Sequence, residues 1–123
     1  MSLSTHVLDA AVGAPAAGVP VSLATAAGEV LASGTTDADG RWSAPIGMPP
    51  AGDHRLIFDI AAYRGARGED VFHTEAVISF RVAPGPGPVL DDADPAPHPP
   101  DPSGHLHLPL LLSPYSYTTY RGS

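Results

Sequence analysis

The chain predicts an all-β sandwich, and three features of its 123 residues lead to that class. Short runs of alternating apolar and polar residues recur along it, as expected of strands with one buried face. Gly, Pro and Asp separate these runs at short intervals, which favours hairpins over parallel βαβ units. Hydrophobic residues make up 43% of the chain, which is enough to fill one core, and the length fits a single domain, 1–123.

Strands are expected where the alternation is clearest, and one interruption marks a helix. The first run alternates around His6, and a later Asp37-Ala38-Asp39-Gly40 segment is a strong turn signal just before Arg41. Between residues 60 and 66 an Ala-Ala-Tyr-Arg stretch breaks the alternation, which predicts a short helix. The expected strands are 3–8, 19–23, 29–35, 54–60, 75–82, 105–112 and 115–120.

The chain ends in two apolar, β-prone runs around a Ser-Pro turn, which predicts a terminal hairpin. Terminal residues usually fray, but a hairpin that packs down to the chain end should order residues 120–123. Side chains alternate along a strand, so His105 and His107 point to one face. The two histidines, Arg121 and Ser123 therefore form a polar cluster near the chain end.

Residues 84–103 stand apart as an inserted surface loop that is rich in Pro and Asp. Eight of the fifteen prolines lie there, and proline fixes φ and lacks the amide donor that a central strand needs. An extended, polyproline-like loop is therefore expected. Because it directly precedes the two histidines, it either overhangs a site or serves as a solvated spacer, and the spacer is the preferred interpretation.

Composition and charge exclude several kinds of partner. The net charge is −7, of which the four Asp residues of 84–103 contribute −4, and all six basic residues are arginines that form no basic stripe. Nucleic acid and anionic membranes are therefore not expected as partners. No apolar run approaches the roughly 20 residues that span a bilayer, the first residues lack a secretory signal, and cysteine is absent. A cytoplasmic location is predicted.

Histidine and arginine are the candidate residues for catalysis and substrate binding. Histidine suits proton transfer because its unperturbed pKa lies near 6.5, and the planar guanidinium of arginine matches a flat, anionic, carbonyl-rich molecule. Opening a strained cyclic amide needs water deprotonated, an oxyanion stabilised and the leaving nitrogen protonated. A zinc site is the rival use of His6, His105 and His107, but it would have three ligands at most, without cysteine or an HExxH helix. No metal and no cofactor are predicted.

Four segments carry a resemblance to a known family. They are Leu3-Ser4-Thr5-His6-Val7-Leu8-Asp9, Thr36-Asp37-Ala38-Asp39-Gly40-Arg41, His105-Leu106-His107 with the Leu-Pro-Leu-Leu-Leu-Ser-Pro run after it, and the terminal Tyr120-Arg121-Gly122-Ser123. Together they resemble the 5-hydroxyisourate hydrolases, the enzymatic branch of the transthyretin-like proteins, over nearly the whole chain outside the Pro-rich stretch. The resemblance implies a transthyretin-like (prealbumin-like) β-sandwich of two four-stranded sheets with one short helix.

The same resemblance implies an activity and an assembly. The activity is hydrolysis of 5-hydroxyisourate to 2-oxo-4-hydroxy-4-carboxy-5-ureidoimidazoline in urate degradation, without a cofactor. The assembly is a homotetramer, a dimer of dimers with sites at the dimer–dimer interface. Carried over onto this sequence, the catalytic residues are His6, Arg41, His107 and Ser123, and the substrate-binding residues are Arg41, Tyr120, Arg121, Gly122 and Ser123.

The implied roles divide among these side chains. His6 and His107 would activate water and relay protons, with the choice of base left open. Arg41 would bind the anionic edge of the substrate, Arg121 would hold the terminal segment or the substrate, and Ser123 would position water or substrate. Taken singly, His6 is equally typical of a hydrogen-bonded surface histidine, and Arg41 of an ion pair with one of the preceding aspartates.

The sequence departs from the family pattern at two places, and two other functions are considered. Phe72-His73-Thr74-Glu75 stands where the family has two aromatics, Pro and Glu, and Ser116 replaces a glycine, which puts the hairpin's backbone geometry in question. The other functions are a transthyretin-like carrier of a small hydrophobic ligand and a non-catalytic docking module. The joint presence of the histidines, Arg41 and the terminal Tyr-Arg-Gly-Ser disfavours both.

Overall fold

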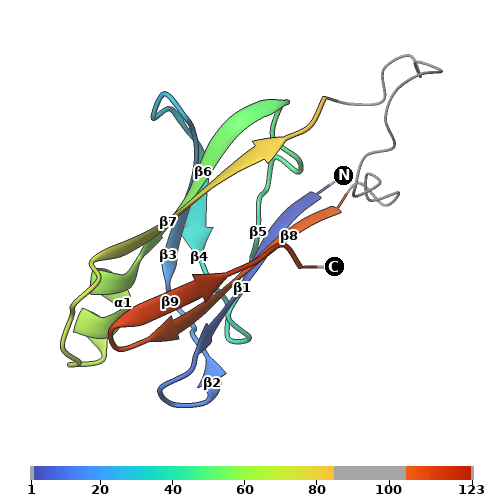
Figure 1. Cartoon of the computed structure of the whole chain (residues 1–123). Helices are drawn as coiled ribbons and strands as arrows, with labels where there is room; N and C mark the ends of the chain where they lie inside the picture. Colours follow the sequence, from blue (N-terminus) through green and yellow to red (C-terminus); the bar gives the residue numbers. More distant parts are fainter. Residues whose placement is uncertain (1, 85–104, 123) are drawn as a thin grey trace.

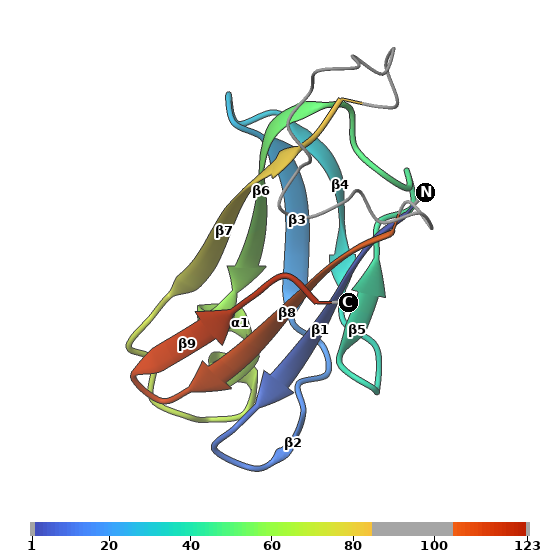
Figure 2. The ribbon, with the colours of Figure 1, turned by 45° about the vertical axis from the view of Figure 1, so that its right-hand side comes forward.

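Two β-sheets pack face to face and form most of the molecule (Figure 1, Figure 2). The computed structural model describes residues 2–84 and 105–122. The first sheet has the order β2-β1-β8-β9, with β5 also paired to β1, and the second has the order β4-β3-β6-β7.

The first sheet joins the two ends of the chain. Its strands are β1 (Ser2–Asp9), β2 (Ala14–Pro15), β5 (Arg41–Ser43), β8 (His105–Ser113) and β9 (Ser116–Thr119). β1 runs parallel to β8 and antiparallel to β2 and β5. β9 folds back on β8 as the predicted hairpin, so the N-terminal strand β1 lies beside the C-terminal hairpin and next to β8 (Figure 2).

The second sheet is antiparallel throughout. It consists of β3 (Pro20–Thr25), β4 (Val30–Thr35), β6 (Gly52–Asp59) and β7 (Glu75–Val82). The helix α1 (Ile60–Ala66) follows β6 directly, and the carboxylate of Asp59 caps it by accepting the Ala62 amide proton at 2.9 Å.

The predicted sandwich with a short helix is confirmed, and the helix has its predicted bounds. The first sheet, however, has five strands instead of four, because the two-residue β2 pairs with the end of β1. Two residues are too few to display alternation. The strand expected at 54–60 is Gly52–Asp59, since Ile60 begins α1, and the last strand is Ser116–Thr119 instead of 115–120.

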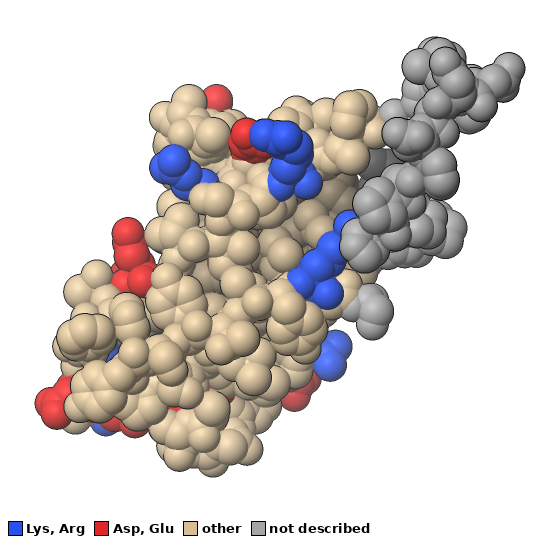
Figure 3. All heavy atoms as spheres, viewed as in Figure 1, with Lys and Arg blue, Asp and Glu red and all other residues tan. Residues whose placement is uncertain are grey.

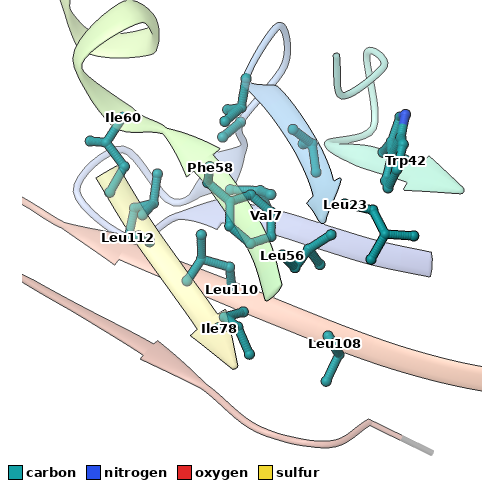
Figure 4. Close-up of a cluster of buried hydrophobic side chains, with 14 of the residues drawn as sticks. Val7, Leu23, Trp42, Leu56, Phe58, Ile60, Ile78, Leu108, Leu110 and Leu112 are labelled. Carbon is teal, nitrogen blue, oxygen red and sulfur yellow. The ribbon is translucent and has the colours of Figure 1, made fainter. Parts of the chain in front are cut away.

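The core lies between the sheets and is filled by the inward side chains of both (Figure 4). Along β1, buried and half-buried residues alternate without exception. From β8, Leu108, Leu110 and Leu112 join the same cluster as Leu56 and Phe58 of β6. Since these residues point inward, the residues between them on β1 and β8 are left on the outer face of the first sheet.

A buried polar cluster ties α1 to the end of β1. Asp9 is fully buried, and its carboxylate accepts hydrogen bonds from the Tyr63 hydroxyl at 2.9 Å and the Ala11 amide at 3.0 Å. Arg64 donates to the Ser113 carbonyl at 3.1 Å and lies 3.8 Å from the Asp9 carboxylate. Burial and the hydrogen bond to Asp9 raise the pKa of Tyr63 to about 12, so this hydroxyl remains a donor.

Both departures from the family pattern are accommodated. Ser116 begins β9 opposite Ser113, and no non-glycine residue among those described has a positive φ, so the hairpin needs no glycine at this position. The ring of His73 packs edge-on against Phe72 and Tyr117, with ring centroids 4.8 and 5.2 Å away, and β7 begins soon after it.

Two predictions fall outside the described part of the chain. The inserted loop predicted at 84–103 lies outside it from Gly85 onward, and so does Ser123. Within residues 2–84 and 105–122, no helix is long and apolar enough to cross a membrane.

Candidate active site

The outer face of the first sheet carries the predicted histidines. On β1 the inward residues are the buried ones, so Ser4 and His6 point outward. On β8 the inward Leu108 leaves His107 on the opposite, outer face, together with His105. The parallel pairing of β1 and β8 sets Ser4 opposite His107. Two polar stretches about one hundred residues apart in sequence thus form one surface.

The turn before β5 aims Arg41 at the same face. The carboxylate of Asp37 accepts the backbone amide protons of Asp39 at 2.9 Å and Arg41 at 3.0 Å, which closes the turn. Gly40 has φ of +75°, and a Cβ there would lie 2.3 Å from the Val7 carbonyl oxygen, so only glycine fits. The Thr-Asp-x-x-Gly-Arg motif therefore forms a tight turn that positions Arg41 beside β1.

Arg41 on β5 lies directly opposite His6 on β1 in the register of the two antiparallel strands. The sequence left open an ion pair between Arg41 and a preceding aspartate. In the part of the chain that the structure describes, Asp37 binds the Arg41 amide, and no carboxylate forms a salt bridge with the guanidinium. The Arg41 side chain is exposed on the outer face, where it can meet an anion.

The imidazole ring of His6 is held by a hydrogen bond to a backbone carbonyl. Its Nε2–H donates to the carbonyl oxygen of Asp39 at 2.9 Å. With Nε2 engaged as a donor, the neutral ring carries its lone pair on Nδ1. The hydrogen bond expected of a surface histidine is present, and it leaves one ring nitrogen for proton transfer.

His107 is the histidine whose titration the site changes. Partial burial lowers the pKa of His107, and the positive charges of His105, His6 and Arg41 lower it further. Its Nδ1 lies 2.9 Å from the hydroxyl of Ser4. In the tautomer in which Nδ1–H donates to Ser4, the neutral ring has its lone pair on Nε2 and can accept a proton there.

The terminal segment returns to His107. Of the residues predicted to be ordered, 120–123, the structure describes 120–122. The Gly122 amide donates to the His107 carbonyl at 2.8 Å, and the Thr119 hydroxyl donates to the Pro109 carbonyl at 2.8 Å. A Cβ on Gly122 would lie 2.7 Å from Cδ2 of the His107 ring. Glycine is therefore needed at this position for close approach, with no positive φ involved.

The structure thus gathers four of the predicted site residues, while two functional neighbours were not assigned a role from sequence. His6, Arg41, His107 and Gly122 share the outer face, Tyr120 and Arg121 are exposed next to Gly122, and Ser123 lies outside the described residues. These neighbours are Ser4, which was not singled out from sequence, and His105, which was placed only in the terminal polar cluster and among possible zinc ligands; both lie beside His107. The signal was present, because Ser4 lies two residues before His6 and must share its face.

Within the described residues, neither a metal-binding cluster nor the hollow found on the second sheet coincides with this face. Among residues 2–84 and 105–122, no three His, Asp or Glu side chains are arranged to hold a metal ion. An open hollow of about 400 Å³ lies on the second sheet instead, between Ala26, His54 and Phe80. The histidines therefore lie on the outer surface of one sheet, apart from that hollow.

Fold and site together define a class: a two-sheet sandwich in which one outer face is equipped for acid–base chemistry on an anion. The family model described as the HIUase/Transthyretin family matches residues 3–88 and 98–122, and the chain belongs to that family. Residues 89–97, which the match leaves out, lie within the predicted inserted loop.

Known members of the family are similar to the chain over most of their lengths. The 5-hydroxyisourate hydrolase of Deinococcus radiodurans is 38% identical over 98% of this chain and 95% of that protein. Among solved structures, the 5-hydroxyisourate hydrolase of Klebsiella pneumoniae has a TM-score of 0.78 and 35% identity and covers 100% of both chains. Transthyretin from Sparus aurata has a TM-score of 0.73 and 34% identity over 98% of this chain and 95% of its own.

Proposed function

We propose that this chain hydrolyses 5-hydroxyisourate to 2-oxo-4-hydroxy-4-carboxy-5-ureidoimidazoline in urate degradation. The observation that carries the proposal is the assembly of His6, Arg41 and His107 on one sheet face. Full-length relatives named as 5-hydroxyisourate hydrolases support the same activity. The fold alone does not decide between hydrolase and carrier, since transthyretin shares it, but a carrier of hydrophobic ligands has no use for this polar group of side chains.

The reaction is the opening of a cyclic amide by water. His107 is assigned as the base, because its lowered pKa favours the neutral ring, which is the form that can accept a proton. Water gives a proton to His107 while its oxygen bonds to the ring carbonyl carbon. The carbon–nitrogen bond then breaks, and the leaving nitrogen takes a proton, for which His6 is the second carrier. The proton taken up by His107 replaces the one that His6 gives to the nitrogen, and the carboxylic acid product ionises to a carboxylate by releasing one proton to solvent, so atoms and charge balance.

Arg41 stabilises negative charge on the substrate and in the transition state. Its guanidinium is exposed on the same face and can bind the anionic, carbonyl-rich edge of the substrate through paired N–H donors. As the carbonyl oxygen becomes negative, a fixed cation nearby stabilises it. No metal is needed for any of these steps, and the proposal includes none.

The terminal Tyr120-Arg121-Gly122-Ser123 segment forms the substrate-binding edge. Support for this assignment comes from the contact of Gly122 with the His107 backbone and ring. A substrate bound over His107 would then contact Tyr120 and Arg121, which directly precede Gly122. Ser123 is assigned the positioning of water or substrate at the chain end.

A homotetramer, as a dimer of dimers with its sites between dimers, is the proposed assembly, and the cytoplasm is the proposed location. β7 and β9 are the last strands of their sheets, and such edges present backbone groups for pairing with another chain. Exposed apolar side chains accompany them, including Val77 and Tyr117. In Figure 3 the middle of the face that carries β7 and β9 is free of charged side chains, which lie toward its margins.

The test is a spectrophotometric assay with freshly generated 5-hydroxyisourate. Its ultraviolet absorbance is followed with and without the purified protein, and with the H107A variant as a matched control. The proposal requires the wild-type protein to accelerate decay well beyond the spontaneous rate. Decay at the spontaneous rate with a folded, tetrameric protein would refute it.

A further inference from the structure

A line of hydrogen-bonded side chains extends from His107 along the outer face of the first sheet. The parallel register of β1 and β8 sets Ser2 opposite His105 and Ser4 opposite His107. The Ser2 hydroxyl forms a hydrogen bond with Nδ1 of His105. The Ser4 hydroxyl lies 3.1 Å from Nε2 of His105 and 2.9 Å from Nδ1 of His107. The two imidazole rings are nearly parallel, with an interplanar angle of 17° and centroids 6.1 Å apart.

We propose that Ser4 is a positioning residue that couples the tautomers of His105 and His107 and forms the central link of a proton relay, Ser2–His105–Ser4–His107. The relay extends the proposed function, because its last member is the histidine assigned to activate water. Ser4 and His105 do not touch the substrate in this scheme; they act through His107.

The coupling follows from the single proton of a hydroxyl group. Ser4 contacts two ring nitrogens but has one hydroxyl proton, so it can donate to only one of them, and the other nitrogen must carry a proton that Ser4 accepts. If Ser4 accepts Nδ1–H of His107, it donates to Nε2 of His105, and Nε2 of His107 is left with its lone pair. If Ser4 donates to His107, the pattern reverses and Nε2 of His107 carries a proton. The two histidines therefore change tautomer together.

The same geometry lets a proton pass through without a free ion on Ser4. His107 takes a proton from water at Nε2 and releases the proton on Nδ1 to the Ser4 oxygen. Ser4 releases its own proton to Nε2 of His105, which becomes an imidazolium that hydrogen-bonds Ser2. His107 ends neutral with Nε2–H, and it can give this proton to the leaving nitrogen when the reverse relay returns a proton from His105 through Ser4 to Nδ1. One proton has moved from water to His105, and each O–H or N–H bond broken is matched by one formed.

The surroundings of His107 favour moving the charge away from it. The titratable and charged groups that act on it are His6 on β1, Arg41 on β5 and His105 on β8. Partial burial together with these positive charges makes the protonated state of His107 unfavourable. A link that hands the charge on regenerates a neutral His107 for the next proton transfer.

The coupling is tested by nuclear magnetic resonance on ¹⁵N-labelled protein, which reports histidine tautomers and pKa values without substrate. Ser4→Ala should change the tautomer populations of both His105 and His107, and Ser4→Thr should restore them. Ser43→Ala is the matched control, because Ser43 lies opposite Ser4 on β5 and is exposed. Unchanged tautomers and pKa values in a folded Ser4→Ala protein would overturn the coupling.

The relay itself is tested by turnover. Ser4→Ala should lower kcat about tenfold with little change in KM, which is less than the roughly 10²–10⁴-fold of a group that itself exchanges a proton with the reactants, because Ser4 acts through His107. Ser4→Thr should recover the rate. His105→Gln keeps a hydrogen-bonding partner for Ser4 but cannot hold a proton, and it should lower kcat similarly. Wild-type turnover in His105→Gln would overturn the relay. If the wild-type protein does not hydrolyse 5-hydroxyisourate, the proposed function fails, while the substrate-free spectra still decide the coupling.

Discussion

Replacing Gly122 with alanine should disable the site while leaving the fold intact. The added Cβ would lie 2.7 Å from Cδ2 of His107 and 3.3 Å from Cγ of Pro109. Carbon atoms pack at about 3.5–4.0 Å, so the His107 ring or the terminal segment must move by about 1 Å. A misplacement of about 1 Å in a catalytic group can cost about 10²-fold. We therefore expect kcat/KM to fall about 10²-fold.

The stability of G122A should change much less than its activity. At most the hydrogen bond from the Gly122 amide to the His107 carbonyl, 2.8 Å long, is weakened, which costs about 1 kcal/mol. G65A is the matched control, because a Cβ on Gly65 of α1 meets no atom within 4 Å. Activity is measured by decay of 5-hydroxyisourate and stability by thermal unfolding. A folded G122A protein as active as the wild type would refute the role of this close contact.

Four further outcomes are expected. H107A and R41A should each lower turnover by about 10²-fold or more, with unchanged circular dichroism because both residues lie on the outer face; full activity in either would remove its assigned role. Because the pKa of His107 is lowered, the rate should hold as pH falls to the ordinary histidine value of about 6.5 and decline only below it, whereas a decline centred above that value would contradict the assignment. Chelator should leave the rate unchanged, and a loss that zinc restores would contradict a metal-free site. Y63F should cost about 1–3 kcal/mol in urea unfolding, since it removes a donor to the buried Asp9 carboxylate, and should leave turnover intact; unchanged stability would contradict that.

Local patterns in the sequence predicted most elements because their causes are local. The strand at Glu75–Val82 and the helix at Ile60–Ala66 have their predicted bounds, since alternation and its interruption are written in neighbouring residues. The common face of His105 and His107 likewise follows from a period of two. The two-residue β2 was missed because it is too short to carry a pattern, and it forms only because β1 is already in place beside it.

The sequence by itself determined the class of fold, the facing of each strand and the residue types of the site. Only the tertiary structure decided which strands are neighbours. Alternation states which side chains point outward, but the partner of a strand depends on how the whole core packs. The parallel pairing of β1 with β8 sets Ser4 against His107, and β5 adds Arg41 beside His6. The lowered pKa of His107 and the contacts of Ser4 depend on that register, because burial and charge act through space and not along the chain.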